Sequence, residues 1–502
     1  MCFRGAVHWK QAVFCVLALG LGLRLTAYLE DRSLWLDEAM LARNIVTRSF
    51  RDLARPLDYN QGAPVGYLAA VKTFVLIGGP SEYTLRAMSL LAAAIALGIF
   101  AALAKRYFGG INWVFACALF SISPILVYYA GEAKQYSQDV LASVLLLYLL
   151  STLGPIATLR SVAVLGIAGA VSVWFSHSAV FVLGAMGALL VFKAIHDRHA
   201  AQFIAAAALA IIWLLSLVLL YQISLRDLSG NRALLGYWHE YFVPGSLVEA
   251  LRWGWNRYWF LFLDPINVQH GDVKYANPAG YLMGWLFAIG LASLWSTRKE
   301  LAWMIAGPFL LVLIASAFRL YPFGGFRGRL MLFTVPLITM GCAAGWQTLA
   351  MTQKWFITAT VAGAILLPAI RMCGYEALEK VEELRPLIQR ISAEFRPGDG
   401  VYVSSGARPA FALYASDFGY LSGQALNIVN ERVDVHQTDV EDRHFSTLKG
   451  TGRLWVVYSH PPKGDRDLSD EERLVVAARA YGKELESFQS PGASLRLFWF
   501  AP

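Results

Sequence analysis

Residues 11–29, QAVFCVLALGLGLRLTAYL, lead almost directly into the segment SLWLDEAMLARN, which runs from Ser33 to Asn44. The first stretch is apolar and close to the roughly 20 residues that a helix needs to cross a bilayer. No small-residue cleavage site follows it, so we interpret it as a retained membrane anchor rather than a signal peptide. Two adjacent carboxylates, Asp37 and Glu38, therefore lie at a membrane surface, where an unpaired charge is costly. An acidic pair in that place indicates either a structural cap or a functional site.

The composition of the 502-residue chain is that of a membrane protein. Hydrophobic residues make up 57% of it and charged residues 16%, and the mean hydropathy is +0.48, whereas about a quarter of a soluble domain is charged. The net charge of +8 would suggest a nucleic-acid partner in a soluble protein. Here the placement of the basic residues in the loops between apolar runs matters more. We therefore expect membrane lipids, and no nucleic acid, among the partners.

Apolar runs recur as far as Arg371 and predict about eleven transmembrane helices. Placing the N-terminus in the cytoplasm puts at least one Lys or Arg in every short inward segment, as the positive-inside rule requires. An odd number of spans then places the C-terminus outside the cytoplasm. The predicted spans are residues 11–29, 84–104, 112–128, 138–152, 161–175, 178–192, 203–221, 281–297, 302–318, 330–348 and 355–371.

Two long segments between these spans are predicted to lie on the outer side, residues 30–83 and 222–280. In the first, residues 39–56 have apolar side chains at helical spacing opposite arginines, which predicts an amphipathic helix on the membrane surface. Residues 62–79 are apolar too, and we place them as a second interfacial helix, because a span there would invert every later loop. The second segment, which we call the aromatic loop (residues 222–280), is rich in rings that suit a membrane interface and also stack on sugars.

After Arg371 the composition changes to that of a small α/β domain on the outer side. The fold class is therefore an α-helical polytopic membrane domain, residues 1–371, followed by an extracytoplasmic domain, residues 372–502. Residues 376–395 predict an amphipathic helix that breaks or restarts at Pro386. No G-x-G-x-x-G and no P-loop lysine is present, so we expect no nucleotide there. Further predicted elements are strands at 401–405, 453–459 and 494–500 and a helix at 470–481.

The five cysteines predict neither a disulfide nor a zinc site. They show no C-x-x-C spacing and no cluster with histidines. Three of them lie inside apolar runs, where cysteine packs as a small hydrophobe.

Two further segments on the outer side carry polar groups that match the acidic pair. The stretch YYAGEAKQYSQ, residues 128–138, contributes Glu132, Lys134 and Tyr136. The stretch RLYPFGGFRGRL, residues 319–330, combines three arginines with three glycines, and we call it the arginine loop. Arginine forks bind phosphate oxygens bidentately, and glycine-rich turns form anion-binding nests. Carboxylates and arginines on one face favour chemistry on a lipid-linked phosphate.

Each of these features also has a structural interpretation. Asp37 can be a helix cap that accepts backbone N–H bonds, and Glu38 can be a solvated acid of the first helical turn. Glu132 and Lys134 can form a surface ion pair. The arginine loop can bind lipid headgroups without any chemistry.

The order of SLWLDEAM, GAPVGYL, GPSEYTLRAMSLLAAAIA, YYAGEAKQYS and LYPFGGFRGRLMLFTVP resembles the GT-C glycosyltransferases that use polyprenyl-phosphate sugars. These include the protein O-mannosyltransferases and the aminoarabinose transferases that modify lipid A. The resemblance covers most of the membrane part and is strongest over residues 20–140. It implies a membrane glycosyltransferase with a hexosyl or pentosyl donor linked to a lipid phosphate.

The resemblance also implies roles for individual residues. Asp37 matches the catalytic aspartate and is assigned as general base, with Glu38 as a supporting acceptor for hydroxyl groups. Arg327 matches the phosphate-binding arginine, and Arg329 is a second candidate. The aminoarabinose transferases have a lysine in the segment that matches YNQGAP, which has none here, so Lys134 is the substitute candidate. The substrate-binding candidates are Gln61, Glu132, Tyr136 and His177 of WFSHSAV, for which an interfacial histidine is the alternative.

The implied reaction is an inverting displacement, in which an acceptor hydroxyl attacks the anomeric carbon on the extracytoplasmic side of a bacterial inner membrane. The expected partners are a polyprenyl-phosphate sugar and a glycan, lipid or protein acceptor. No cofactor is expected, although Asp37, Glu38 and Glu132 have the chemistry to hold a divalent cation. A transporter or flippase of a lipid-linked sugar is the alternative, but transporters place polar residues near the bilayer midplane, where this chain has few. A non-catalytic envelope scaffold would leave the acidic pair and the arginine loop without a common purpose.

Overall fold

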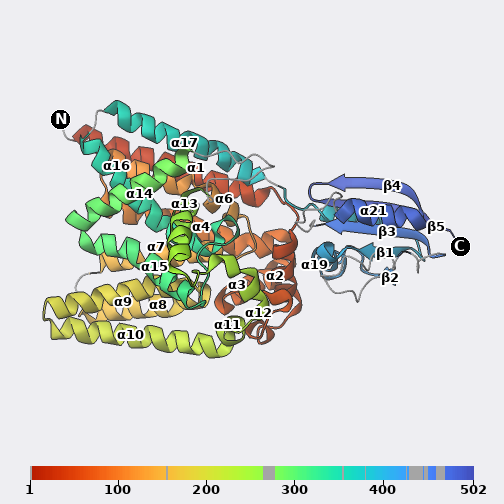
Figure 1. Ribbon diagram of the computed structural model, residues 1–502, viewed down its shortest axis with the longest axis horizontal. Coiled ribbons are helices and arrows are strands. Elements are labelled where there is room, and N and C mark those ends of the chain that lie inside the picture. The colour runs from red at the N-terminus through yellow and green to blue at the C-terminus, as the bar shows by residue number, and fades with distance from the viewer. Residues whose placement is uncertain are drawn as a thin grey trace.

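The computed structural model describes residues 3–153, 156–263, 278–352, 355–378, 380–424, 427–428, 445, 450–459 and 470–501. Long helices form a bundle at one end of the molecule, and a small sheet with its own helices lies at the other (Figure 1). The N-terminus lies at the end of the bundle that is far from the sheet. Helices α2 (Leu36–Thr47) and α3 (Val65–Gly78) lie at the end of the bundle that faces the sheet domain.

A helix is present at each of the eleven predicted spans, which confirms the predicted class of multi-pass helical membrane protein. Seven described helices are long and apolar enough to cross a membrane, or eight if the bent pair α5 and α6 is one span. The bend of 49° falls at Pro124, because proline has no N–H to continue the helix. The count of eleven spans stays a prediction. The helices are α1 (Phe3–Leu29), α4 (Glu82–Tyr107), α5 (Gly110–Ser121), α6 (Pro124–Ala130), α7 (Tyr136–Thr152), α8 (Leu159–Phe175), α9 (Ala179–His196), α10 (Ala200–Leu220), α14 (Pro278–Thr297), α15 (Lys299–Ala317), α16 (Val335–Thr352) and α17 (Trp355–Leu378).

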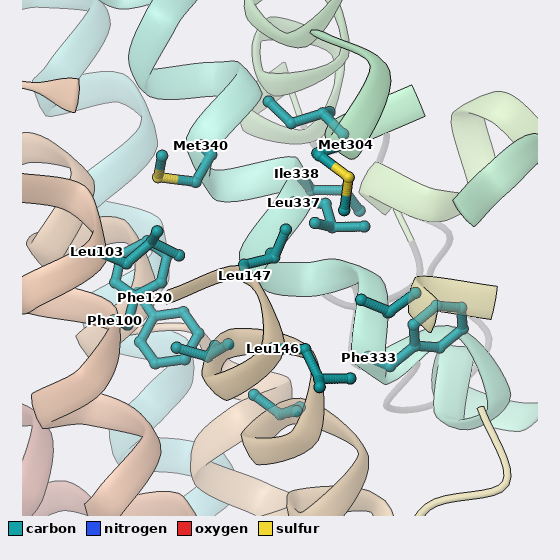
Figure 2. Packing of buried hydrophobic residues seen from close by; sticks show 14 of the residues in the cluster. Phe100, Leu103, Phe120, Leu146, Leu147, Met304, Phe333, Leu337, Ile338 and Met340 are labelled. Carbon is teal, nitrogen blue, oxygen red and sulfur yellow. The ribbon is translucent and has the colours of Figure 1, made fainter. Parts of the chain in front are cut away.

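Apolar side chains from α4, α5, α7, α15 and α16 meet in the core of the bundle (Figure 2). The rings of Phe100 and Phe120 stack there with their centroids 4.1 Å apart. Elsewhere α14 and α16 approach so closely that a Cβ on Gly345 would overlap the carbonyl oxygen of Leu286. Small residues at such a crossing allow two backbones to touch. The labelled core residues are Phe100, Leu103, Phe120, Leu146, Leu147, Met304, Phe333, Leu337, Ile338 and Met340.

The predicted amphipathic helix at 39–56 is wrong in its length and in what covers its apolar face. Helix α2 ends at Thr47, and a 3₁₀ turn follows at Asp52–Ala54. Leu41 and Ile45 are fully buried in an apolar cluster that includes residues of the C-terminal domain. The apolar face of α2 therefore packs against protein, because residues of the C-terminal domain cover part of it.

Helix α3 has 14 residues, which is too short to cross a bilayer upright. It packs on α4 and α2 through Tyr67, Leu68 and Val71, which are buried, whereas Leu76 and Ile77 at its C-terminal end are exposed. Its placement at a membrane interface stays a prediction.

The described part of the aromatic loop is mostly helical, and its residues around Tyr241 lie against the arginine loop. The backbone N–H of Phe323 donates to the carbonyl of Tyr241 at 2.8 Å. Gly324 has a φ of +131°, and a Cβ there would lie 2.8 Å from the ring of Tyr241, so glycine is required at this close approach. Residues 264–277 of the aromatic loop lie outside the described residues. The elements are α11 (Arg226–Ser229), α12 (Arg232–Tyr237), a 3₁₀ turn at His239–Tyr241 and α13 (Leu247–Leu263).

The C-terminal domain is the predicted small α/β module. Its sheet has five strands in the order β2-β1-β3-β5-β4. Strand β1 pairs in parallel with β2 and β3, whereas β5 pairs antiparallel with β3 and β4. Between α17 and the sheet, the predicted helix is broken, and α18 restarts with Pro386 in its first turn. The elements are α18 (Arg385–Glu394), β1 (Gly400–Val403), α19 (Arg408–Ala412), β2 (Asn427–Ile428), β3 (Gly452–Ser459), α21 (Asp470–Tyr481), β4 (Lys483–Ser490) and β5 (Ala493–Phe500).

Candidate functional site

Asp37 is the second residue of α2, and its carboxylate lies between two cations from distant parts of the chain. Arg329 Nη1 donates to Oδ2 at 2.7 Å, and Lys134 Nζ lies 3.1 Å from Oδ1. The amide of Gln61 donates to Oδ1 at 3.4 Å and, through its own Oε1, accepts from Lys134 at 2.8 Å. The fold therefore joins the segment of residues 30–83, the loop before α7 and the arginine loop at one carboxylate.

The charge state of Asp37 follows from this environment. Burial would raise the pKa of Asp37, but the charges of Lys134 and Arg329, with hydrogen bonds from Lys134 and Gln61, outweigh it and hold the pKa well below its usual range. Burial lowers the pKa of Lys134, and Asp37 opposes that shift. Asp37 is thus an anion at neutral pH, and its side chain keeps 19% exposure. It has the charge and access to interact with a ligand.

Glu38 points in a different direction from its neighbour, as expected for adjacent residues of a helix. Its carboxylate is completely buried and accepts from Arg86 Nε at 3.0 Å and Nη2 at 2.7 Å. The backbone N–H of Ala133 donates to the same carboxylate at 2.6 Å. These contacts make Glu38 a structural tie between α2, α4 and the loop before α7, and its role toward hydroxyl groups stays a prediction.

Glu132 belongs to the same buried group as Glu38. Its oxygens accept from Arg32 Nη2 at 3.0 Å and from the Trp35 indole at 2.9 Å. Burial, with the nearby charge of Glu38, raises the pKa of Glu132 to about 7. Glu132 therefore fixes the segment that leads into α2, and sugar binding by it stays a prediction.

Arg329 is held on its other side by the aromatic loop. Its guanidinium lies over the Trp238 ring, 5.0 Å from the centroid, which favours a cation in that position. The Nε of Arg329 is buried and has no hydrogen-bond partner among the described residues. An arginine with an unused buried donor beside a carboxylate is suited to bind a further anion.

The remaining predicted residues lie in the first turn of α7, in the turn between α8 and α9, and in the arginine loop. Tyr136 is buried in the first turn of α7, with its ring against that of Tyr129. His177 lies in the turn between α8 and α9, next to Ser176. The hydroxyl of Ser176 donates to Asp139, which lies on α7 about one turn after Tyr136. Burial lowers the pKa of His177 to about 4, so it is neutral at pH 7. The side chain of Arg327 lies outside the described residues.

Sequence reasoning missed Arg86 and Gln135, and it included Trp238 only as one of the many rings of the aromatic loop. An arginine inside the apolar run of α4 was a usable signal, because an intramembrane charge requires a buried partner. Gln135 lies beside Lys134, and its Oε1 is buried without a partner among the described residues, so it is an additional candidate for binding a hydroxyl group. No sequence pattern distinguishes Trp238 from the other rings of the aromatic loop.

The described residues include no metal-binding group, and a cavity of the bundle lies apart from this centre. No group of three or more His, Cys, Asp or Glu side chains within the described part of the chain could hold a metal ion. A cavity of about 410 Å³ lies between α4, α7, α9, α15 and α16, with Lys193 and Glu300 in its lining. None of the predicted site residues lines it.

The arrangement defines a multi-pass membrane protein with the fold of the GT-C glycosyltransferases, as the motifs predicted. In particular, the chain shares its fold with ArnT from Cupriavidus metallidurans bound to undecaprenyl phosphate, with a TM-score of 0.57, 13% sequence identity and coverage of 97% of both chains. The apo state of ArnT matches with a TM-score of 0.55 and 12% identity, covering 97% of this chain and 98% of the other.

A second similar structure is the archaeal oligosaccharyltransferase AglB from Archaeoglobus fulgidus in complex with an inhibitory peptide and a dolichol-phosphate. It matches with a TM-score of 0.51 and 10% identity, and the similarity covers 97% of this chain and 74% of AglB. No protein-family profile and no curated protein sequence matches the chain. The likeness is therefore one of fold.

Proposed function

We propose that this protein is a membrane glycosyltransferase that moves a sugar from a polyprenyl-phosphate carrier to an acceptor hydroxyl. The observation that carries the proposal is the contact of Asp37 with Arg329 and Lys134, in a fold shared with a protein bound to undecaprenyl phosphate. Two cations at one partly exposed carboxylate form a site in which a phosphate can replace the carboxylate as their partner.

In the proposed mechanism, the donor phosphate binds Arg329 and Lys134, and this releases the Asp37 carboxylate. An acceptor hydroxyl then attacks the anomeric carbon from the face opposite the phosphate. The bond from the acceptor oxygen to the anomeric carbon forms while the bond from that carbon to the phosphate oxygen breaks. The acceptor proton goes to Asp37, and the polyprenyl phosphate leaves with its negative charge stabilised by Arg329. One displacement gives inversion.

The proposal places this chemistry on the extracytoplasmic face, with the N-terminus in the cytoplasm. Arg329 and Lys134 supply the positive charge that the leaving phosphate needs, so the proposed mechanism uses no metal. The donor sugar is a hexose or pentose, and the acceptor is a hydroxyl of a glycan, a lipid or a protein.

The test compares the purified wild-type protein with Asp37→Asn. Each is given radiolabelled polyprenyl-phosphate sugars and envelope extract, and both carrier binding and label transfer are measured. We expect Asp37→Asn to bind the carrier and to lose about 10²- to 10⁴-fold in transfer rate. Asp58→Asn is the matched control, since Asp58 lies in the same outer segment with its side chain 68% exposed.

The possible results separate the alternatives. Transfer by Asp37→Asn at the wild-type rate would show that the carboxylate is only structural. Wild-type protein that binds the carrier but transfers label to no acceptor would favour a transporter of lipid-linked sugars.

A further inference from the structure

The C-terminal domain makes direct hydrogen bonds to the segment that leads into α2. The N–H of Leu36, the first residue of α2, donates to Glu382 Oε2 at 2.9 Å. Ser33 donates twice to Glu383, from its N–H at 3.1 Å and from its hydroxyl at 2.9 Å. Both glutamates are buried, each with 5% exposure. Side chains of another domain therefore satisfy backbone donors next to Asp37.

These bonds replace a cap that α2 does not provide for itself. The first N–H groups of a helix have no partner within the helix and usually receive one from the N-cap side chain. At α2 the N-cap residue is Trp35, and its side chain makes no capping hydrogen bond. The carboxylate of Glu382 supplies an acceptor and a negative charge at the positive end of the helix dipole. The start of α2 is thus fixed by a residue 346 positions later in the chain.

Additional contacts hold the same segment between the two domains. The hydroxyl of Tyr414 accepts from the N–H of Leu34 at 2.6 Å and donates to Glu82 at 3.0 Å. Arg385 bonds Asp31 at 3.0 Å and Glu82 at 2.9 Å. Glu82 is the first residue of α4, so these bonds also join the C-terminal domain to the bundle.

Helix α2 is held farther along its length as well. Arg43 pairs with Asp417 at 3.0 Å. Leu41 and Ile45 share one apolar cluster with residues of the C-terminal domain, such as Phe411. The helix has little freedom to shift while the domain is docked.

We infer that the C-terminal domain is a positioning element of the active site and that Glu382 and Glu383 are positioning residues for Asp37. Their hydrogen bonds to Ser33 and Leu36 fix the backbone from which Asp37 projects, so that the carboxylate meets Arg329 and Lys134. The catalytic part of this inference rests on the proposed glycosyltransferase function. The mechanical part, that the domain holds α2, does not.

The experiment uses the full-length protein in detergent and three variants. Glu382→Ala removes the acceptor from Leu36, whereas Glu382→Gln keeps a neutral acceptor of the same size and serves as the conservative rescue. Glu486→Ala is the matched control, because Glu486 is a half-exposed glutamate on strand β4 of the same domain. Amide hydrogen exchange of the peptides that cover residues 31–40 is measured first, followed by transfer kinetics and their pH profile.

In Glu382→Ala we expect faster exchange in residues 31–40, with wild-type rates in the control. We expect kcat to fall about 10- to 100-fold, since a displacement near 1 Å has effects of that size, with the carrier KM changed less than about 2-fold. In the free protein, an Asp37 held farther from Lys134 and Arg329 has a higher pKa, so the acid limb of kcat/KM, which reports the protein without substrate, should move to higher pH. Glu382→Gln should restore most of the rate.

Two results overturn the inference. Unchanged exchange in Glu382→Ala would show that the domain does not hold α2, whatever the activity. Faster exchange with an unchanged kcat and acid limb would show that the contact does not position Asp37. If the wild type transfers no sugar, the proposed function fails, and hydrogen exchange still decides whether the domain fixes α2.

Discussion

Replacing Arg86 with methionine removes both hydrogen bonds that the buried Glu38 carboxylate accepts from a guanidinium, at 3.0 and 2.7 Å. Methionine fills much of the same volume but leaves the carboxylate with the N–H of Ala133 and beside Glu132. Hydrogen bonds to charged groups contribute about 1.5–3 kcal/mol each, and removing one partner of a buried pair costs about 3–5 kcal/mol. We therefore expect Arg86→Met to lower the free energy of unfolding by about 3–5 kcal/mol.

The assay is unfolding of the detergent-solubilised protein by SDS, followed by tryptophan fluorescence. The double variant Glu38→Gln with Arg86→Met should recover about 0.5–3 kcal/mol relative to the sum of the single changes, because it leaves no unpaired buried charge. The control is Lys193→Met, which breaks the exposed pair of Lys193 with Glu300 and should cost at most about 1 kcal/mol. A loss below about 1 kcal/mol for Arg86→Met would refute the structural role given to this pair.

Two further predictions concern pH and helix packing. In the folded state the pKa of Glu132 is raised to about 7, whereas the pKa of an unfolded glutamate is about 4.3. Between these two pH values the folded state binds the additional proton, so the contribution of Glu132 to the free energy of unfolding falls as pH rises. Glu132→Gln should flatten the pH dependence of the unfolding midpoint in that window; an unchanged slope would contradict the raised pKa. Gly345→Ala should destabilise the protein by at least about 1–3 kcal/mol, because its Cβ overlaps the backbone of α14. Gly98→Ala, with open space around its Cβ, should have little effect in the same SDS unfolding assay, and equal effects of the two substitutions would refute the close crossing.

Patterns within one element were sufficient to predict most of the fold. The apolar runs predicted a helix at every span, and the strands at 453–459 and 494–500 followed from alternating or continuous apolar residues. Strand β4 was missed because it lies at the edge of the sheet, with most of its side chains at least partly exposed. Its sequence, KELESFQS, has the polar character of an exposed segment.

Relations between distant segments were harder to predict. The resemblance of the motifs to a family identified Asp37, Lys134 and Arg329 as candidates for one site, and the structure brings them into contact. Periodicity identifies an apolar face but does not say what covers it. We therefore predicted that the apolar face of α2 meets the membrane, whereas residues of the C-terminal domain cover part of it. The capping of α2 by Glu382 has no local signal, since neither segment shows a need for the other.

Because Glu382 lies far along the chain from α2, the start of α2 stays uncapped during part of protein synthesis. Leu36 leaves the ribosome 346 residues before Glu382, which corresponds to a delay of roughly 20 to 70 s at ordinary rates of synthesis. During that time α2 lacks its partner, although the helices around it are already available to insert. The hydrogen bonds that hold the start of α2 therefore form only when the last quarter of the chain arrives, and a protein truncated before Glu382 would lack them.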